Sequence, residues 1–219
     1  FIIIFIIILA IGLRFYQLGS NPPSLDWDEV SLGYNAYSIL KTGSDEYGIF
    51  LPTNIRSFDD YKPPIYVYLT IPSVAVFGLN EFAIRFPSAA TGVLTVIVMY
   101  FLVRELLSKW EGQHRKWIAL AAAFFLAISP WHLQFSRAAF EGNIGLFFLM
   151  AGLWLFLQGL KNSKLFLVSI LFFILSLYSY HSFRLLTPLF LGFLAIVFWK
   201  DLVKERIISF AALILFMLF

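Results

Sequence analysis

The sequence predicts an all-α polytopic membrane protein, with about seven transmembrane helices and an interfacial helix in a long first external loop. Of its 219 residues, 60% are apolar and 13% are charged, and the mean hydropathy is +0.83. A soluble domain carries about 25% charged residues. The apolar residues form helix-length runs, and short basic blocks separate several of them, which favours membrane topology over nucleic-acid binding as the reason for the net charge of +3.

Each predicted span is a mostly apolar run, since a helix needs about 17 to 25 such residues to cross a bilayer. The first run begins without a Met and the last stops inside an apolar stretch. We therefore expect a single transmembrane module over residues 1–219 that is truncated at both ends. The runs, several of them short, are Phe1 to Leu18, Phe82 to Val103, Trp117 to Ser129, Ile144 to Leu160, Leu165 to Tyr180, Leu185 to Trp199 and Ile207 to Phe219.

The positions of the basic residues predict which side of the membrane each loop faces, because Lys-rich and Arg-rich loops stay in the cytoplasm. Nine of the 16 Lys and Arg residues lie in three connections: Arg104 to Lys116, Lys161 to Lys164 and Lys200 to Arg206. These connections alternate with loops that are poor in basic residues. We place the three in the cytoplasm and the alternating loops on the outer side of the cell membrane.

The run Pro64 to Gly78 is short and contains Pro72, and counting it as a span would reverse every later loop. If the acidic first loop is external, one crossing must connect Lys62 to Arg104, and Phe82 to Val103 has the right length. We therefore expect Pro64 to Gly78 to lie in the outer interface. It would belong to a first external loop, residues 19–81, with juxtamembrane helices. A full span is the alternative.

Asp28 and Glu29 lie behind the first span, in a segment from Gly19 to Lys62 that holds seven of the 13 acidic residues. Ionisable groups beside a membrane span are costly and indicate function. Apolar and aromatic residues recur at helical spacing after this pair, so it also fits a helix N-terminus. In the alternative interpretation, Asp26 or Asp28 caps that helix and does nothing else.

Two outer-side cations fit a phosphate site. Lys62 precedes Pro63 and Pro64, whose restricted backbone would hold an ammonium in place; the alternative is a lysine that snorkels at the membrane edge. Arg85 lies in the first turns of a span and serves equally well as a ligand or as an i,i+4 partner of Glu81.

Three further residues on the outer side complete the set of candidates. Glu141 is a second carboxylate that can meet Asp28, or it can pair with Arg137 at i,i+4. His181 and Arg184 follow another span and can contact a lipid phosphate, whereas the tyrosines beside them fit an aromatic belt. There is no Gly-rich phosphate loop, no HExxH and no GxSxG motif, and the three His residues are far apart in sequence.

These motifs together resemble the GT-C glycosyltransferases, in particular the glycosyltransferase family 39 type that includes protein O-mannosyltransferases and the aminoarabinose transferase of lipid A. The resemblance covers about the first 145 residues well and the rest as a hydropathy pattern. Its motifs, in order, are Asp28-Glu29, Gly33-Tyr34-Asn35-Ala36, Thr42-Gly43 with Leu51-Pro52, Tyr61-Lys62-Pro63-Pro64, Phe77-Gly78 with Glu81-Phe82, and Arg85-Phe86-Pro87-Ser88-Ala89.

The resemblance implies a transferase that takes a sugar from a polyprenyl-phosphate donor on the extracytoplasmic side. It implies that Asp28 is the catalytic base or orients the acceptor, with Glu29 beside it. Lys62 would contact the donor phosphate with help from Arg85, and Glu141 would be another outer-side acid. In the aminoarabinose branch a Glu commonly precedes the lysine, so Tyr61 argues against that substrate.

The expected reaction moves a sugar to a hydroxyl of a protein, lipid or glycan acceptor, with inversion if it proceeds in one displacement. A carboxylate takes the proton of the hydroxyl, and cations stabilise the departing phosphate. A divalent cation held by Asp28 and Glu141 is compatible with this pattern, although no metal site is assigned. The rival functions are a transporter or flippase of lipid-linked saccharides and a noncatalytic membrane assembly subunit.

Overall fold

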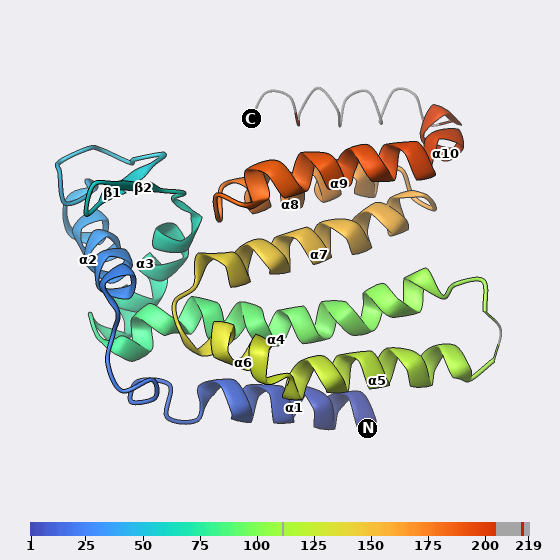
Figure 1. Ribbon diagram of the computed structural model, residues 1–219, viewed down its shortest axis with the longest axis horizontal. Helices are drawn as coiled ribbons and strands as arrows, with labels where there is room; N and C mark the ends of the chain where they lie inside the picture. Colours follow the sequence, from blue (N-terminus) through green and yellow to red (C-terminus); the bar gives the residue numbers. More distant parts are fainter. Residues whose placement is uncertain (111, 205–215, 217–219) are drawn as a thin grey trace.

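The computed structural model describes residues 1–110, 112–204 and 216, and its long helices run side by side along one axis (Figure 1). These helices are α1 (Ile2–Phe15), α4 (Glu81–Leu106), α5 (His114–Ile128), α7 (Glu141–Gly159), α8 (Lys164–Leu177) and α9 (Phe183–Val197). The short α6 (Pro130–Arg137) continues α5 after a bend of 56°. The short α10 (Trp199–Lys204) follows α9.

A separate lobe covers one end of this bundle and comprises residues 19–80 (Figure 1). It contains α2 (Trp27–Thr42), α3 (Ile65–Phe77) and a two-stranded antiparallel hairpin of β1 (Ile55–Ser57) and β2 (Asp60–Lys62). In Figure 1, α2 and α3 stand across the direction of the long helices. The sequence did not predict the hairpin, because strands of three residues are too short to show a period-two pattern.

Length and apolar composition make α4 and α7 long enough to cross a membrane, and the bent pair α5 and α6 adds a third crossing if it is one span. The helices α1, α3, α8 and α9 are apolar but shorter. A mostly helical membrane fold is therefore supported, while seven crossings stay a prediction. The predicted span Ile207 to Phe219 lies outside the described residues, apart from Phe216.

Helix α2 begins with a capping box, which satisfies backbone N–H groups that have no partner inside the helix. Asp26 Oδ1 accepts the N–H of Glu29 at 2.8 Å, and Glu29 Oε2 accepts the N–H of Asp26 at 3.2 Å. At the other end, Gly43 adopts φ 75° and donates its N–H to Ile39. Asp26 is thus the cap, and Asp28 in the first turn is free of that task.

Helix α4 contains Pro87, which has no N–H for the carbonyl of Ala83 four residues earlier. The hydroxyl of Ser73 in α3 donates to that carbonyl at 2.6 Å instead. One residue further, the carbonyl of Ile84 accepts the hydroxyl of Tyr66 at 3.0 Å. Two side chains of α3 therefore hold the lobe on the first turns of α4.

Helices α7 and α8 approach closely because glycines recur every seven residues along α7. A Cβ at Gly152 would lie 3.1 Å from the ring of Phe173, and one at Gly159 would lie 2.7 Å from the ring of Phe166. The rings of α8 occupy the space that these glycines leave. Because the hydrophobic effect does not drive helices together in lipid, close packing at small residues stabilises their association instead.

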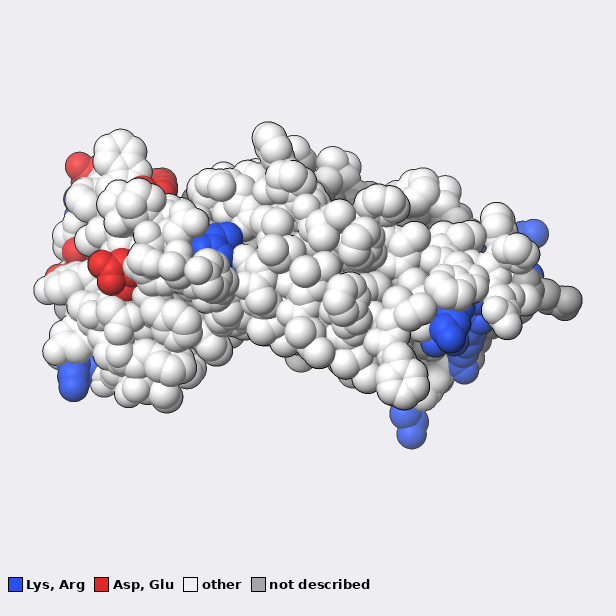
Figure 2. All heavy atoms as spheres, turned by 90° about the horizontal axis from the view of Figure 1, so that it is seen from below, with Lys and Arg blue, Asp and Glu red and all other residues white. Residues whose placement is uncertain are grey.

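Most charged side chains lie toward the two ends of the molecule, and basic side chains occur at both ends (Figure 2). Figure 2 shows acidic side chains gathered on the lobe and a group of basic side chains at the opposite end. The basic end holds the α4–α5 and α7–α8 connections, with Arg104, Lys109, Arg115, Lys116, Lys161 and Lys164. All the described connections that we placed in the cytoplasm thus lie together, away from the lobe.

Candidate active site at the lobe

Asp28 and Lys62 form an ion pair that joins the first turn of α2 to the end of β2. The side chain of Asp28 is 48% exposed, whereas that of Lys62 is only 7% exposed. Pro63 and Pro64 follow Lys62 directly and fix the backbone that leads into α3. The structure therefore brings the two central sequence candidates together, with the carboxylate facing solvent and the ammonium behind it.

Glu29, the neighbour of Asp28, is buried and bonded on both carboxylate oxygens. Oε1 accepts Nε of Arg85 at 2.9 Å and the N–H of Ala139 at 2.9 Å. Oε2 accepts Nη2 of Arg85 at 3.1 Å as well as the N–H of Asp26. This carboxylate holds α2, α4 and the segment before α7 together, and it is inaccessible to a substrate.

Arg85 is fully buried and directs its guanidinium into the lobe rather than toward Glu81. Nη1 donates to the carbonyls of Leu18 and Pro22 at 3.1 and 2.8 Å, and Nη2 donates to Ser24 at 2.8 Å. Together with the two bonds to Glu29, these contacts use all five guanidinium N–H groups. Arg85 thus has no N–H left for a donor phosphate.

Glu141 begins α7 and is buried, with 7% of its surface exposed. It interacts electrostatically with Lys62, Asp28 and Asp26, which places it within range of the ion pair. The predicted alternative partner, Arg137, donates instead to the carbonyls of Leu13 and Asn21 at 2.8 Å each. Glu141 is therefore buried near Asp28 and Lys62, and among the described residues no hydrogen bond or ion pair joins it to either side chain.

The connection between α8 and α9 lies at the same end of the bundle. The N–H of Ile65 at the start of α3 donates to the carbonyl of Tyr178 at 3.3 Å. Tyr180 approaches the α7 start, since a Cβ at Gly142 would lie 3.7 Å from its ring. His181 and Arg184 are exposed, and no contact between either side chain and Lys62 is observed in the described part of the chain. They remain predicted phosphate ligands at the edge of the site.

A buried arginine that sequence reasoning missed supports the segment leading to Glu141. Arg14 of α1 is fully buried, donates to the carbonyl of Ala127 at 3.1 Å and contacts Nδ1 of His132 at 2.7 Å. Arg14 thereby binds a backbone carbonyl at the end of α5, where the chain bends into α6. The sequence did contain a signal for this residue, because an arginine inside the apolar run Phe1 to Leu18 is costly unless it has a partner.

The donor set offers a poor fit to a divalent cation. Asp28 and Glu141 are two carboxylates, but the ammonium of Lys62 already pairs with Asp28. Within the described ranges, no group of three or more His, Cys, Asp or Glu side chains is positioned to hold a metal. Because the ammonium of Lys62 occupies the place that a cation would take beside Asp28, we derive no step through a metal.

The long apolar helices, with a group of basic side chains at the end opposite the lobe, define a helical membrane protein. Residues 61–219 match the model of the dolichyl-phosphate-mannose-protein mannosyltransferase family. The chain belongs to this family, which confirms the resemblance to GT-C glycosyltransferases. The matched region includes Lys62, Arg85 and Glu141, and Asp28 and Glu29 precede it.

Two curated proteins are similar to this chain. YkcB of Bacillus subtilis (strain 168), provisionally named a mannosyltransferase, is 26% identical over 113 residues, which are 52% of this chain and 15% of that protein. An uncharacterized protein of Aquifex aeolicus (strain VF5) is 27% identical over 162 residues, which are 74% of this chain and 30% of that protein. The chain therefore spans less than a third of either relative. No solved structure matches it.

Proposed function

We propose that the protein is a membrane glycosyltransferase that moves a sugar from a polyprenyl-phosphate donor to an acceptor hydroxyl on the extracytoplasmic side, with inversion. The observation that carries the proposal is that the neighbouring carboxylates Asp28 and Glu29 have different surroundings. Asp26 and Glu29 satisfy the start of α2, and Glu29 also binds Arg85. Asp28 stays half-exposed, with only Lys62 as its ion-pair partner among the described residues.

Asp28 acts as the general base in this proposal. Its carboxylate accepts the proton of the acceptor hydroxyl while the acceptor oxygen attacks C1 of the sugar. The bond between C1 and the phosphate oxygen breaks in the same displacement, so the configuration at C1 inverts. The polyprenyl phosphate leaves with the electron pair of that bond.

Lys62 stabilises the departing phosphate. Its ammonium is nearly buried, and a cation held in a partly desolvated site acts more strongly on developing negative charge than one in water. Before donor binding, Lys62 and Asp28 neutralise each other. An incoming phosphate competes for the ammonium and leaves the Asp28 carboxylate available as a base.

Glu141 and the Glu29–Arg85 pair support this exchange. Glu141 lies within electrostatic range of Lys62, so it holds the ammonium in the site while Asp28 takes up a proton. Glu29 and Arg85 are positioning residues, because they fix the first turn of α2 and the segment that leads to Glu141. His181 and Arg184 are additional phosphate ligands at the open edge.

The separation of charge supports the proposed sidedness. The basic connections lie at the end opposite the lobe, as expected for loops kept in the cytoplasm (Figure 2). The site at the lobe then faces outward, where the head group of a lipid-linked donor at the outer surface reaches Lys62.

The test uses the full-length protein in membranes that contain its natural acceptor, with radiolabelled polyprenyl-phosphate mannose as the donor probe. Asp28→Asn should lower the rate of sugar transfer by at least about 100-fold, because it removes the general base. Donor binding should persist in this variant, since Lys62 no longer has a carboxylate competitor. Lys62→Gln should instead weaken donor binding by about tenfold, the loss of a charge-assisted contact.

Asp60→Asn is the matched control, since Asp60 is an exposed carboxylate of the same lobe outside the site. It should transfer sugar within about twofold of the natural chain, because surface changes away from such features have small effects. Transfer by Asp28→Asn at the natural rate would refute the assignment of the base. Donor movement across vesicles without sugar transfer would show a flippase instead.

A further inference from the structure

The segment that joins α1 to α2 leads directly to the turn that carries Asp28. The structure describes this segment, residues 16–26, without a helix or a strand, and we call it the linker. Inside it, the N–H groups of Ser20 and Asn21 donate to the carbonyl of Gln17 at 3.1 and 2.9 Å. Gln17 adopts φ 51°, a left-handed conformation that residues other than glycine rarely adopt. Such a conformation persists only where surrounding contacts hold it, so other elements determine the course of the linker.

Arg137, in the last turn of α6, binds both the linker and the end of α1 through backbone carbonyls. Its Nη1 donates to the carbonyls of Leu13 at 2.8 Å and Arg14 at 3.4 Å. Its Nη2 donates to the carbonyls of Gln17 at 3.5 Å and Asn21 at 2.8 Å. The last carbonyls of a helix have no partner inside that helix. Arg137 therefore supplies donors to α1 and to the linker at the same time.

A second arginine, Arg85 of α4, binds three other carbonyls of the linker, those of Leu18, Pro22 and Ser24. The carbonyls that accept from Arg85 lie between and beyond those that accept from Arg137 along the chain. Leu18 is also buried at 1% exposure. The linker is therefore held along its length by side chains of α4 and α6.

Arg137 also lies next to a segment that is fixed to the start of α2. Two residues after Arg137, the N–H of Ala139 donates to Oε1 of Glu29 at 2.9 Å, and α7 then begins at Glu141. Asp28 directly precedes Glu29 in the first turn of α2. One contact of this part of the chain thus fixes the residue after Asp28, and the contacts of Arg137 fix the linker before it. The position of Asp28 relative to the start of α7 depends on both.

We propose that Arg137 is a positioning residue for the sugar transfer, because it holds the linker and thereby fixes how the Asp28 carboxylate faces the acceptor beside Lys62. The inference rests on the proposed function. Arg137 acts through the backbone, and a shift of a catalytic group by about 1 Å can lower a rate about 100-fold. The planar fork of a guanidinium reaches four carbonyls with two nitrogens, whereas a lysine offers a single nitrogen. The geometry of Arg137 is therefore required in addition to its charge.

The test compares Arg137→Lys and Arg137→Gln with the natural full-length protein, with radiolabelled polyprenyl-phosphate mannose as the donor probe. The transfer rate at saturating donor is divided by the number of donor-binding sites found by titration, so that a loss of folded protein does not lower it. Both variants should lower this rate per site by at least about tenfold, since the lysine keeps the charge but not the fork. The Kd of the donor should change by less than about twofold, because Lys62 stays in place.

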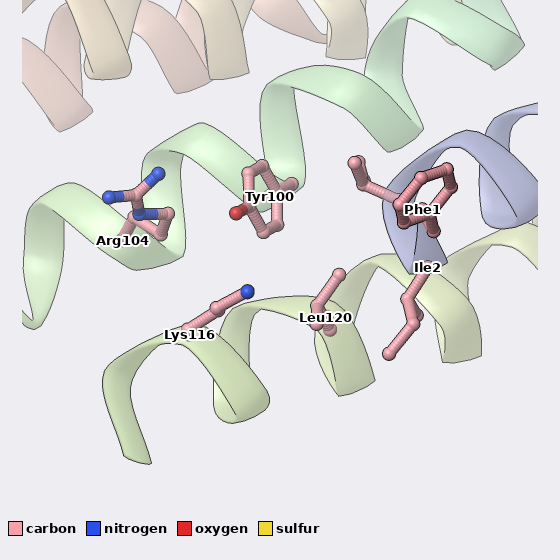
Figure 3. A pocket seen from close by; sticks show the side chains of 7 residues that line it. Phe1, Ile2, Tyr100, Arg104, Lys116 and Leu120 are labelled. Atoms are coloured by element: carbon pink, nitrogen blue, oxygen red, sulfur yellow. The ribbon is translucent and has the colours of Figure 1, made fainter. Parts of the chain in front are cut away.

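Arg104→Lys and Arg104→Gln are the matched controls. Arg104 is half-buried like Arg137 and also lies in the last turn of its helix, but at the basic end of α4. Figure 3 shows it there beside Tyr100, whose ring centroid lies 5.6 Å from the guanidinium carbon. The control variants should keep the rate per site within about twofold. An equal loss in the controls, or a natural rate per site in both Arg137 variants, would overturn the proposal.

Chemical rescue separates geometry from charge. Millimolar guanidinium added to Arg137→Ala should raise the rate per site by at least about threefold, because the free ion offers the same planar donors. Methylammonium at the same concentration should not raise it. Equal recovery with both ions would show that only the charge matters and would refute the positioning role.

Hydrogen exchange of the linker tests the same contacts without an activity measurement. In Arg137→Gln the amides of residues 16–26 should exchange at least about tenfold faster, whereas those of α8 should not change. Unchanged exchange in the linker would refute the inference. If the natural chain transfers no sugar, the proposed function fails; if it transfers sugar and the Arg137 variants keep its rate per site, only this inference fails.

Discussion

Glu29→Gln and Asp28→Asn change neighbouring carboxylates in the same way, and the structure predicts a large loss of stability for the first and a small one for the second. Glu29 accepts four hydrogen bonds and is 3% exposed, whereas the side chain of Asp28 is 48% exposed and has one partner. A glutamine keeps one acceptor oxygen, and its amide would face the N–H groups of Arg85 and Asp26. Arg85 would remain buried without a counter-charge.

The magnitudes follow from burial. Breaking a buried ion pair by removing one partner costs about 3–5 kcal/mol, because the other charge stays uncompensated. The carboxylate of Asp28 is 48% exposed and screened by solvent, and Glu141 still acts on the ammonium of Lys62 after the change, so this loss is discounted to about 0–1 kcal/mol. Glu29→Gln should therefore lower the free energy of unfolding by at least about 2 kcal/mol more than Asp28→Asn does.

The assay is denaturant titration of the full-length protein in detergent micelles, read by tryptophan fluorescence, alongside the rate of sugar transfer. Glu29→Gln should shift the unfolding midpoint, and Asp28→Asn should lose transfer with a nearly unchanged midpoint. The double change Glu29→Gln with Arg85→Gln should be less destabilised than the sum of the single changes, because no unpaired charge remains. Equal midpoint shifts for both single variants would refute the assignment of a structural role to Glu29 and a catalytic role to Asp28.

Three further predictions concern packing and topology. Gly145→Ala should destabilise the protein by about 1–3 kcal/mol by overpacking, since its Cβ would lie 2.4 Å from the ring of Phe183; Phe183→Leu in the same chain should recover part of the loss in thermal unfolding. Arg137→Gln should lower the melting temperature, because the carbonyls that Arg137 binds at the end of α1 lose their donor, and an unchanged temperature would contradict this. In this cysteine-free chain, Asn54→Cys should react with an impermeant thiol reagent from outside intact cells and Gln113→Cys only after lysis; the reverse pattern would overturn the sidedness.

The hydropathy pattern predicted most of the helical architecture, because an apolar run of sufficient length has few alternatives in a bilayer. Helices occupy the predicted runs up to Trp199 within the described residues. Pro64 to Gly78 contains a short helix, α3, that stands across the bundle (Figure 1), and its place in the outer interface stays a prediction. The 56° bend at Pro130 was not predicted; Arg14, which satisfies the carbonyls there, comes from a distant part of the sequence.

The candidate site was predictable as a set of residues but not as a set of roles. Asp28, Lys62 and Glu141 were identified by their position outside the apolar runs; the structure pairs Asp28 with Lys62 and places Glu141 nearby without a direct bond to either. Arg85 was expected to help bind a phosphate, and it uses its N–H groups within the protein. Sequence spacing favoured Glu81 as the partner of Arg85, whereas its actual partner, Glu29, lies 56 residues away in the sequence.

By itself the sequence predicted a helical membrane protein, basic connections that mark its cytoplasmic side, and an acidic segment in which Asp28 and Lys62 are candidate site residues. These properties depend on composition and on neighbours along the chain. Only the tertiary structure decided that Glu29 is buried and fully bonded, whereas Asp28 is half-exposed and pairs with Lys62. The reason is physical: burial and long-range hydrogen bonds distinguish Glu29 from Asp28, and both arise only when α4 and the start of α7 pack against α2.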